Sequence, residues 1–169
     1  MARLGHAPRR GLTLIELMIG LAMIAVLMSL AVPSFNTYLQ RHRLKSVALG
    51  LEADLREARH EAVRRGRPVR VSFQAGPEWC YAIAIEPGCD CRNASPCRLK
   101  AVRAADVRGV QLLQAQSLGF DPASGVADTE GGGATWGVPG GERLRVSVNA
   151  LGRPSVCVQE GQLAPLPGC

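Results

Sequence analysis

One stretch of the chain, residues 12–32, contains only apolar or small side chains apart from Glu16. Its 21 residues match the roughly 20 that an α-helix needs to cross a hydrocarbon core of about 30 Å. The stretch therefore predicts a membrane-spanning helix. A carboxylate one turn into such a helix is energetically expensive and usually has a function. Glu16 indicates that this helix does more than anchor the chain.

Two simpler interpretations of the N-terminus explain less. A cleaved secretory signal would have a shorter apolar core followed by a small-x-small cleavage site, and residues 29–32 match such a site poorly. A plain signal anchor accounts for the apolar length and for the basic residues before it, but leaves Glu16 without a role.

The net charge of +6 is unevenly distributed. Arg3, Arg9 and Arg10 precede the apolar stretch without any acid. Residues 41–70 carry nine Lys or Arg against four acids, whereas residues 71–169 carry eight against nine. Because basic flanks favour the cytoplasmic side, these arginines predict that the N-terminus is cytoplasmic and that the residues after the apolar stretch are exported. The basic residues just after the stretch are an objection to this orientation.

All the cysteines lie beyond the apolar stretch, and their even number favours disulfides in an oxidising compartment: Cys80, Cys89, Cys91, Cys97, Cys157 and Cys169. Six cysteines allow about 15 pairings, so the residues alone leave the connectivity open. One set that fits the spacing joins Cys80 or Cys91 to a partner within residues 89–97. The spacing lacks the C-x2-C pairs typical of structural zinc, and no metal is expected.

Beyond Ser34 the apolar residues follow a helical period and form an amphipathic stripe: Leu44, Val47, Ala48, Leu51, Leu55, Ala58 and Ala62. Gly66 and Pro68 predict the end of this helix. Residues 12–65 are thus expected to form one long helix, kinked where Pro33 removes a backbone hydrogen bond. The stripe must be covered by apolar surface from the rest of the chain.

The remainder predicts β-structure. The expected strands are residues 69–73, 79–85, 110–114, 117–120, 144–148 and 155–159, with a cysteine-bearing loop at 88–96 and an irregular C-terminus from 160. Residues 121–141 are rich in Gly, Pro and Ser and predict a mobile surface loop. The fold class is therefore α+β, a long helix packed on an antiparallel sheet.

The sequence offers little to an enzyme. Its histidines are His6, His42 and His60, and none belongs to a Ser/His/Asp set. The glycines at 131–133 are not followed by the Lys-Ser/Thr of a phosphate-binding loop. We expect no catalytic residue and no cofactor.

The N-terminus resembles the class III signal of type IV pilins and of type II secretion pseudopilins. In that family a basic leader ends in Gly, the mature chain has Glu at its fifth position, and Pro occurs near the twenty-second. With Leu12 counted as first, Gly11, Glu16 and Pro33 fall at these positions. The departure is Leu12, where the family usually has Phe.

Further segments resemble the GspH/FimT minor pilins: LEADLREARHEAVRRGRPV at residues 51–69, Trp-Cys at 79–80, GCDC at 88–91 and LGRPSVC at 151–157. The resemblance implies four segments. Residues 1–11 are a leader cleaved after Gly11, 12–33 a transmembrane and filament-core helix, 34–68 an amphipathic stem, and 69–169 a β-rich domain with disulfides.

The resemblance also implies a function. Prepilin peptidase would cleave after Gly11 and methylate the amine of Leu12 in the bacterial inner membrane. The chain would join other pilins or pseudopilins as a minor subunit that primes assembly of a type IV pilus, with its C-terminal domain in the periplasm. Glu16 of one subunit would pair with the Leu12 amine of its neighbour. A minor pseudopilin of a type II secretion system is an alternative.

Two further features follow from the resemblance. Some FimT proteins bind DNA through a Gly-Arg-x-Arg motif, of which Gly152 and Arg153 match while Ser155 replaces the second arginine. DNA binding is therefore a second alternative, and its phosphate contacts would be few. The family's C-terminal disulfide loop implies a pairing of Cys157 with Cys169.

Overall fold

A computed structural model describes residues 13–85, 89–92 and 98–169. It divides the chain into one unit that ends at Tyr38 and a second that begins at Leu39, and each is described by itself. One helix, α1 (Leu14–Arg65), contributes to both units. The predicted helix over residues 12–65 is confirmed for the residues described.

In the second unit, α1 buries the predicted stripe. All seven residues from Leu44 to Ala62 that the period selects are no more than 5% exposed. The helix ends where it was predicted to end. Gly66 follows with a φ of 62°, and the Arg67 N–H donates to the carbonyl of Ala62 (3.3 Å), which satisfies an acceptor that the helix leaves open.

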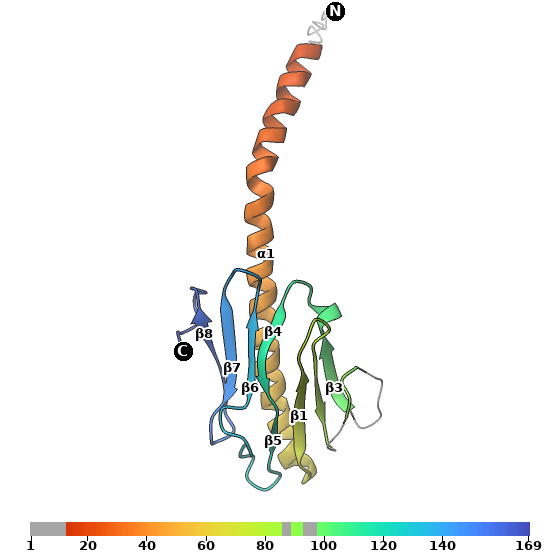
Figure 1. Ribbon diagram of the computed structural model, residues 1–169, viewed down its shortest axis with the longest axis vertical. Coiled ribbons are helices and arrows are strands. Elements are labelled where there is room, and N and C mark those ends of the chain that lie inside the picture. Colours follow the sequence, from red (N-terminus) through yellow and green to blue (C-terminus); the bar gives the residue numbers. More distant parts are fainter. Residues whose placement is uncertain (1–12, 86–88, 93–97) are drawn as a thin grey trace, which may run out of the picture. The chain divides into compact units, whose positions relative to one another are not determined.

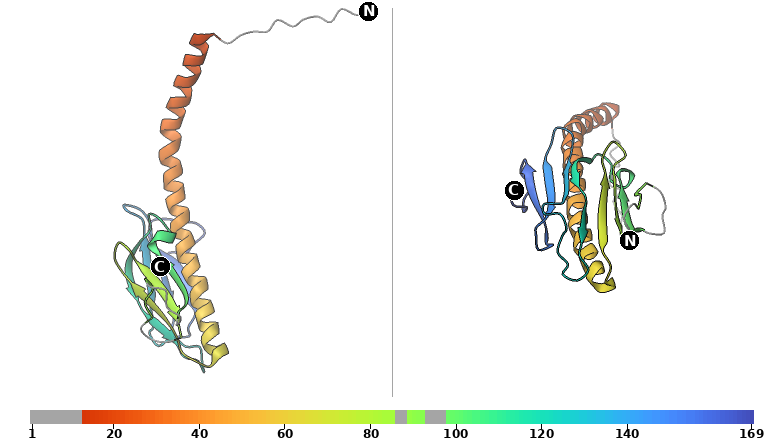
Figure 2. Two further views of the ribbon diagram at one scale, coloured as in Figure 1. Left: turned by 90° about the vertical axis from the view of Figure 1, so that its right-hand side faces the viewer. Right: turned by 60° about the horizontal axis from the view of Figure 1, so that its bottom comes forward.

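In the described ranges, eight strands form two antiparallel four-stranded sheets rather than one, in the orders β3-β2-β1-β5 and β4-β6-β7-β8. Figure 1 shows the two sheets side by side, and Figure 2 shows both on the same side of α1. The strands are β1 (Val69–Gln74), β2 (Cys80–Ala84), β3 (Arg98–Arg103), β4 (Gln111–Gln116), β5 (Leu118–Phe120), β6 (Gly133–Gly137), β7 (Arg143–Val148) and β8 (Pro154–Glu160). A short 3-10 helix, η1 (Ala104–Asp106), follows β3.

Two strands differ from the sequence-based expectation. β3 was not predicted, because its sequence RLKAVR lacks a clear alternation. The prediction of a mobile loop over residues 121–141 was wrong for β6, which is buried along its whole length between β4 and β7. Glycine suits this strand because a Cβ on Gly133 would lie 2.1 Å from the carbonyl oxygen of Val146. The Gly-rich composition thus reflects close backbone packing.

Aromatic side chains join the two sheets beneath α1. Trp79 precedes β2, and Trp136 lies on β6. Their rings pack edge to face with centroids 4.5 Å apart, and the Trp79 indole donates to the carbonyl of Val110 (2.8 Å). Both side chains are fully buried. This contact unites strands of different sheets in one hydrophobic core.

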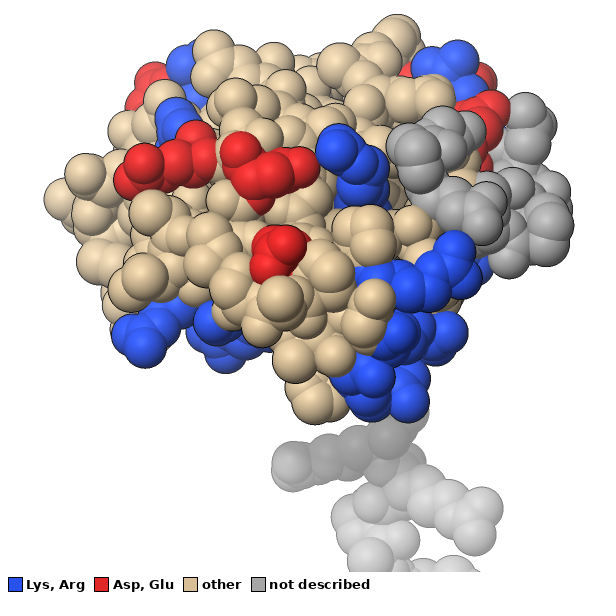
Figure 3. Space-filling model, turned by 90° about the horizontal axis from the view of Figure 1, so that it is seen from below, with Lys and Arg blue, Asp and Glu red and all other residues tan. Residues whose placement is uncertain are grey.

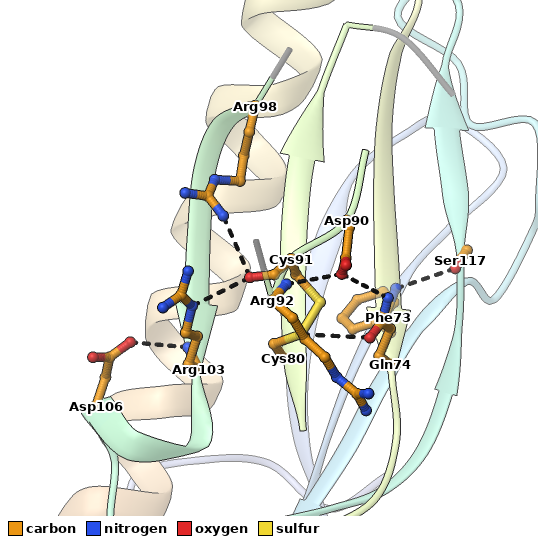
Figure 4. Close-up of a disulfide and its surroundings, with 10 residues drawn as sticks. All are labelled: Phe73, Gln74, Cys80, Asp90, Cys91, Arg92, Arg98, Arg103, Asp106 and Ser117. Carbon is orange, nitrogen blue, oxygen red and sulfur yellow. Dashed lines mark hydrogen bonds between the residues drawn. A yellow bond between two sulfur atoms is a disulfide. The ribbon is translucent and has the colours of Figure 1, made fainter. Parts of the chain in front are cut away.

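Two described disulfides stabilise the sheets at different places. Cys80 of β2 is joined to Cys91, and Cys157 of β8 is joined to Cys169. Figure 4 shows Cys91 beside β2, with side chains of β3 directed toward its carbonyl oxygen. Arg98 (3.3 Å) and Arg103 (3.2 Å) both donate to that oxygen. Cys89 is disulfide-bonded as well, and Cys97 lies outside the described residues.

A buried carboxylate fixes α1 against the first sheet. Asp54 lies within the apolar stripe and is 7% exposed. Its two oxygens accept hydrogen bonds from the Tyr81 hydroxyl (2.8 Å) and from the Lys100 ammonium group (2.6 Å). Burial, together with the charge of Asp54, raises the pKa of Tyr81, so this hydroxyl keeps its proton and remains a donor. These two hydrogen bonds therefore connect the helix to β2 and β3.

We expect Asp54→Ala to lower the free energy of unfolding by about 2 kcal/mol, because it leaves the buried Tyr81 hydroxyl without its acceptor. The Lys100 ion pair adds little, since that side chain is 52% exposed and screened by water. Tryptophan fluorescence during denaturation of the detergent-solubilised chain measures this change, because both tryptophans lie in the second unit. Glu57→Ala, an exposed position on the same helix, is the control. Equal midpoints for the two variants would contradict the role of Asp54.

Candidate functional site

The first unit presents an apolar surface that the described part of the chain leaves exposed. Every large hydrophobic side chain between Leu14 and Tyr38 is at least 51% exposed. The helix is long and apolar enough to cross a membrane, with a mean hydropathy of 2.4 in its most apolar window. Apolar surface of this extent marks contact with lipid or with another protein. It therefore indicates that the chain is anchored in a membrane through its N-terminus.

Glu16 lies in the first turn of this helix and is exposed. Its N–H donates to the Thr13 side-chain oxygen (3.3 Å), so Thr13 caps the helix as the N-cap residue. Glu16 stands three residues later, the acidic position of a capping box, and its charge also favours the helix N-terminus. The carboxylate thus stands at a position that suits the start of the helix, in addition to any role between subunits.

Pro33 lies inside α1. It cannot donate to the carbonyl four residues earlier. Nearby hydroxyls bond to other carbonyls of the helix: Thr37 to Pro33 (3.1 Å) and Ser29 to Val26 (2.7 Å). The predicted processing residues Gly11 and Leu12 lie outside the described residues.

The second group of predicted site residues, Gly152 and Arg153, lies in the turn between β7 and β8. Gly152 is buried with a φ of 72°, and a Cβ there would lie 2.2 Å from the carbonyl oxygen of Gly125. The same oxygen accepts a hydrogen bond from the Arg59 Nε of α1 (2.9 Å). Helix α1, the segment that contains Gly125 and the turn that contains Gly152 therefore meet at one carbonyl. We call Arg59, Gly125 and Gly152 the distal joint. Gly152 has a structural role there.

Arg153 differs from its neighbour because its side chain is exposed. Its backbone N–H donates to the Asn149 side chain (2.9 Å), which stabilises the turn. Figure 3 shows basic side chains along one edge of this end of the molecule. Several of the stem arginines already have acidic partners.

Arg64 and Arg65 both pair with Glu61, and their hydrogen bonds, that of Arg65 first, hold the pKa of this carboxyl below its usual range. Arg70 lies 3.5 Å from Asp128. The positive charge available to a phosphate is therefore reduced.

Among the described residues, no group of three or more His, Cys, Asp and Glu side chains could hold a metal ion. Cys80, Cys91, Cys157 and Cys169 are instead joined in disulfides. His42 and His60 are exposed on α1.

Two family models match the sequence. The model of the type II transport protein GspH matches residues 48–152, more than half of the chain. The chain belongs to the GspH family. The model of the prokaryotic N-terminal methylation motif matches residues 7–32, so this GspH-family chain has a type IV pilin-like N-terminus. No curated protein and no solved structure shows significant similarity to it.

The fold agrees with the family. The α+β architecture, with one long N-terminal helix packed on antiparallel sheets, confirms the fold expected of a type IV pilin-like protein. Proteins of the GspH family are structural subunits rather than enzymes as a rule. The match to the methylation motif lies in the apolar first unit, and the match to GspH lies in the second unit.

Three structural residues were missed by the sequence-based reasoning. Thr13 could have been found, because T-x-x-E at residues 13–16 is the pattern of a capping box. Asp54 could also have been found, since it stands on the buried face beside Leu51 and Leu55. Arg59 gave no signal, because its partner Gly125 is distant in the sequence.

We expect Gly152→Ala to lower the free energy of unfolding by about 3 kcal/mol, because the methyl group adds a clash with Gly125 to the strain of a positive φ. Gly140→Ala is a matched control. It has a φ of 64° but no atom within 4 Å of the new methyl group, so it should cost only about 1 kcal/mol. Denaturation followed by tryptophan fluorescence compares them. A loss for Gly152→Ala no larger than the control's would contradict the close packing of the distal joint.

Proposed function

We propose that this GspH-family chain is a minor pilin that is processed after Gly11 and helps to prime assembly of a type IV pilus. The observation that carries the proposal is the first unit, an exposed apolar helix with a single carboxylate in its first turn. Such a helix fits the bilayer first. It fits the apolar core of a filament afterwards, where the helices of other subunits replace the lipid.

The position of Glu16 supports a role in assembly. Cleavage after Gly11 would create a new amine on Leu12, a positive charge near the edge of the bilayer. In an array of parallel helices, Glu16 of one subunit can pair with the Leu12 amine of the next. Charges attract much more strongly in a low-dielectric environment than in water, and an unpaired buried charge is costly. The pair would therefore fix the axial register between subunits.

We expect Glu16→Gln to insert in the membrane and to be cleaved, but to enter filaments at a level at least about tenfold lower, because the partner amine stays buried without a counter-charge. Gln keeps the shape of the side chain and still suits the third position of a capping box. Immunoblots of sheared filaments and of membranes from the native bacterium measure the two pools.

Thr13→Ala is the control, because it removes the helix cap and leaves the charge of Glu16 in place. It should enter filaments normally. If Thr13→Ala and Glu16→Gln lost incorporation equally, capping of the helix and not charge pairing would explain Glu16. Normal incorporation of Glu16→Gln would refute the pairing.

A second candidate is a minor pseudopilin of a type II secretion system. The description of the matched family, type II transport protein GspH, favours it. The same helix and the same charge pair would serve a pseudopilus. Deletion of the gene separates the candidates, since loss of surface pili supports the pilus function and retention of exported enzymes in the periplasm supports secretion. The neighbouring genes, for pilus assembly or for secretion, provide an independent criterion.

DNA binding during natural transformation is the remaining alternative, and only Arg153 favours it. If the turn between β7 and β8 binds DNA, the chain should shift labelled duplex DNA in a gel, and binding should weaken with salt. Arg153→Gln should then reduce the affinity and the salt dependence by about one phosphate contact. Arg145→Gln, on a strand of the second sheet, is the control. Absence of salt-sensitive binding by the parent chain would end this alternative.

A further inference from the structure

Among the residues that the structure describes, β8 is the last strand of its sheet, and one of its edges has no strand beside it. The end of the chain lies along that edge instead. The Val158 N–H donates to the carbonyl of Pro167 (2.8 Å), and the Val158 carbonyl accepts from the Cys169 N–H (3.1 Å). Val158 and Gly168 thereby form a parallel bridge. We call residues 161–169 the C-terminal strap.

Both non-covalent contacts and a covalent link hold the strap in place. Leu163 and Leu166 are only partly buried against the core. Lys45 of α1 donates to the carbonyl of Ala164 (3.2 Å). The covalent link is the disulfide between Cys157 and Cys169, which lies directly beside the two hydrogen bonds of Val158. The disulfide therefore tethers the strap at the point where it pairs with β8.

The two described disulfides differ in their access to solvent. Cys80 and Cys91 are each 1% exposed and lie in a small buried cluster with Ala82. Cys169 is exposed and Cys157 is partly exposed. Thiol–disulfide exchange requires a thiolate to reach a sulfur atom, so exposed disulfides are the labile ones. A reductant in solution should reach the Cys157–Cys169 link first.

We propose that the C-terminal strap is a thiol-releasable cover of the β8 edge, with Cys157–Cys169 as its lock and Cys80–Cys91 as a permanent link. The reductant is a dithiol. One of its thiolates attacks the Cys169 sulfur and releases the Cys157 thiolate, which takes up a proton. The second thiol of the reductant then displaces Cys169 as a thiol. Two electrons pass to the chain, and the reductant leaves as a cyclic disulfide.

Release changes the edge of the sheet. Main-chain groups point to the same edge at every second residue of a strand. The N–H and C=O groups of Val156 are therefore directed toward the outer edge of β8, as those of Val158 are. Pro154, at the start of β8, has no N–H to offer. An open edge of this kind accepts another extended chain. The locked strap prevents such pairing by occupying the hydrogen-bonding groups of Val158.

Graded reduction of the detergent-solubilised full chain tests the proposal. After each concentration of dithiothreitol, free thiols are alkylated and located by mass spectrometry. Cys157 and Cys169 should be labelled at a dithiol concentration at least about tenfold below that needed for Cys80 and Cys91. At that concentration, hydrogen exchange at the amides of Val158 and Cys169 should accelerate about 100-fold, the effect expected when a loop of this length loses its cross-link.

The Cys157→Ser/Cys169→Ser variant should show the same fast exchange without any reductant. Slow hydrogen exchange at the amides of β2 would show that the core of this variant is intact. Leu163→Ala/Leu166→Ala, with the disulfide kept, is the matched control. Its amides at Val158 and Cys169 should exchange more slowly than those of the serine variant. Two results would overturn the proposal. One is reduction of both disulfides at the same concentration, and the other is continued protection of Val158 after Cys157 and Cys169 are free.

Discussion

The burial of one face of α1 against both sheets is the contact on which the second unit depends. Its stripe from Leu44 to Ala62 is almost inaccessible to water, and no other helix of comparable length covers the sheets among the described residues. Before Leu39 the same helix keeps its apolar side chains exposed. Because such a surface is unfavourable in water, the first unit needs lipid or other helices. One continuous element thus links a folded domain to an external apolar environment.

Polar contacts from α1 supplement this burial. Arg41 pairs with the buried Glu142 (2.6 Å), Arg43 donates to the carbonyl of Arg108 (3.4 Å), and Lys45 reaches the carbonyl of Ala164. These are the basic residues just beyond the apolar stretch, whose charge is an objection to an exported domain. Their partners give them a structural reason to be there that is independent of membrane orientation.

The elements with strong periodicity were predictable, and those formed by distant contacts were not. The stripe of α1 and the alternation in β1, β7 and β8 follow directly from side-chain spacing. β6 was not predictable because its glycines favour a loop locally, and only the approach of the Val146 carbonyl explains them. In the candidate site, too, local features were predictable and distant contacts were not. Glu16 was evident from charge in an apolar run, whereas the contact between Arg59 and Gly125 joins residues far apart in the chain.

The two residues of the Gly-Arg pair at 152–153 have different roles, because only Gly152 belongs to the distal joint. Gly152 is required by packing, because any side chain there would displace the Gly125 carbonyl that Arg59 binds. A chain with this fold would therefore keep the glycine whether or not it bound DNA. Arg153 is exposed and contributes to the turn through its backbone, so only its side chain is available to a ligand. The match at Gly152 consequently carries information about the fold, and any information about nucleic acid rests on Arg153 alone.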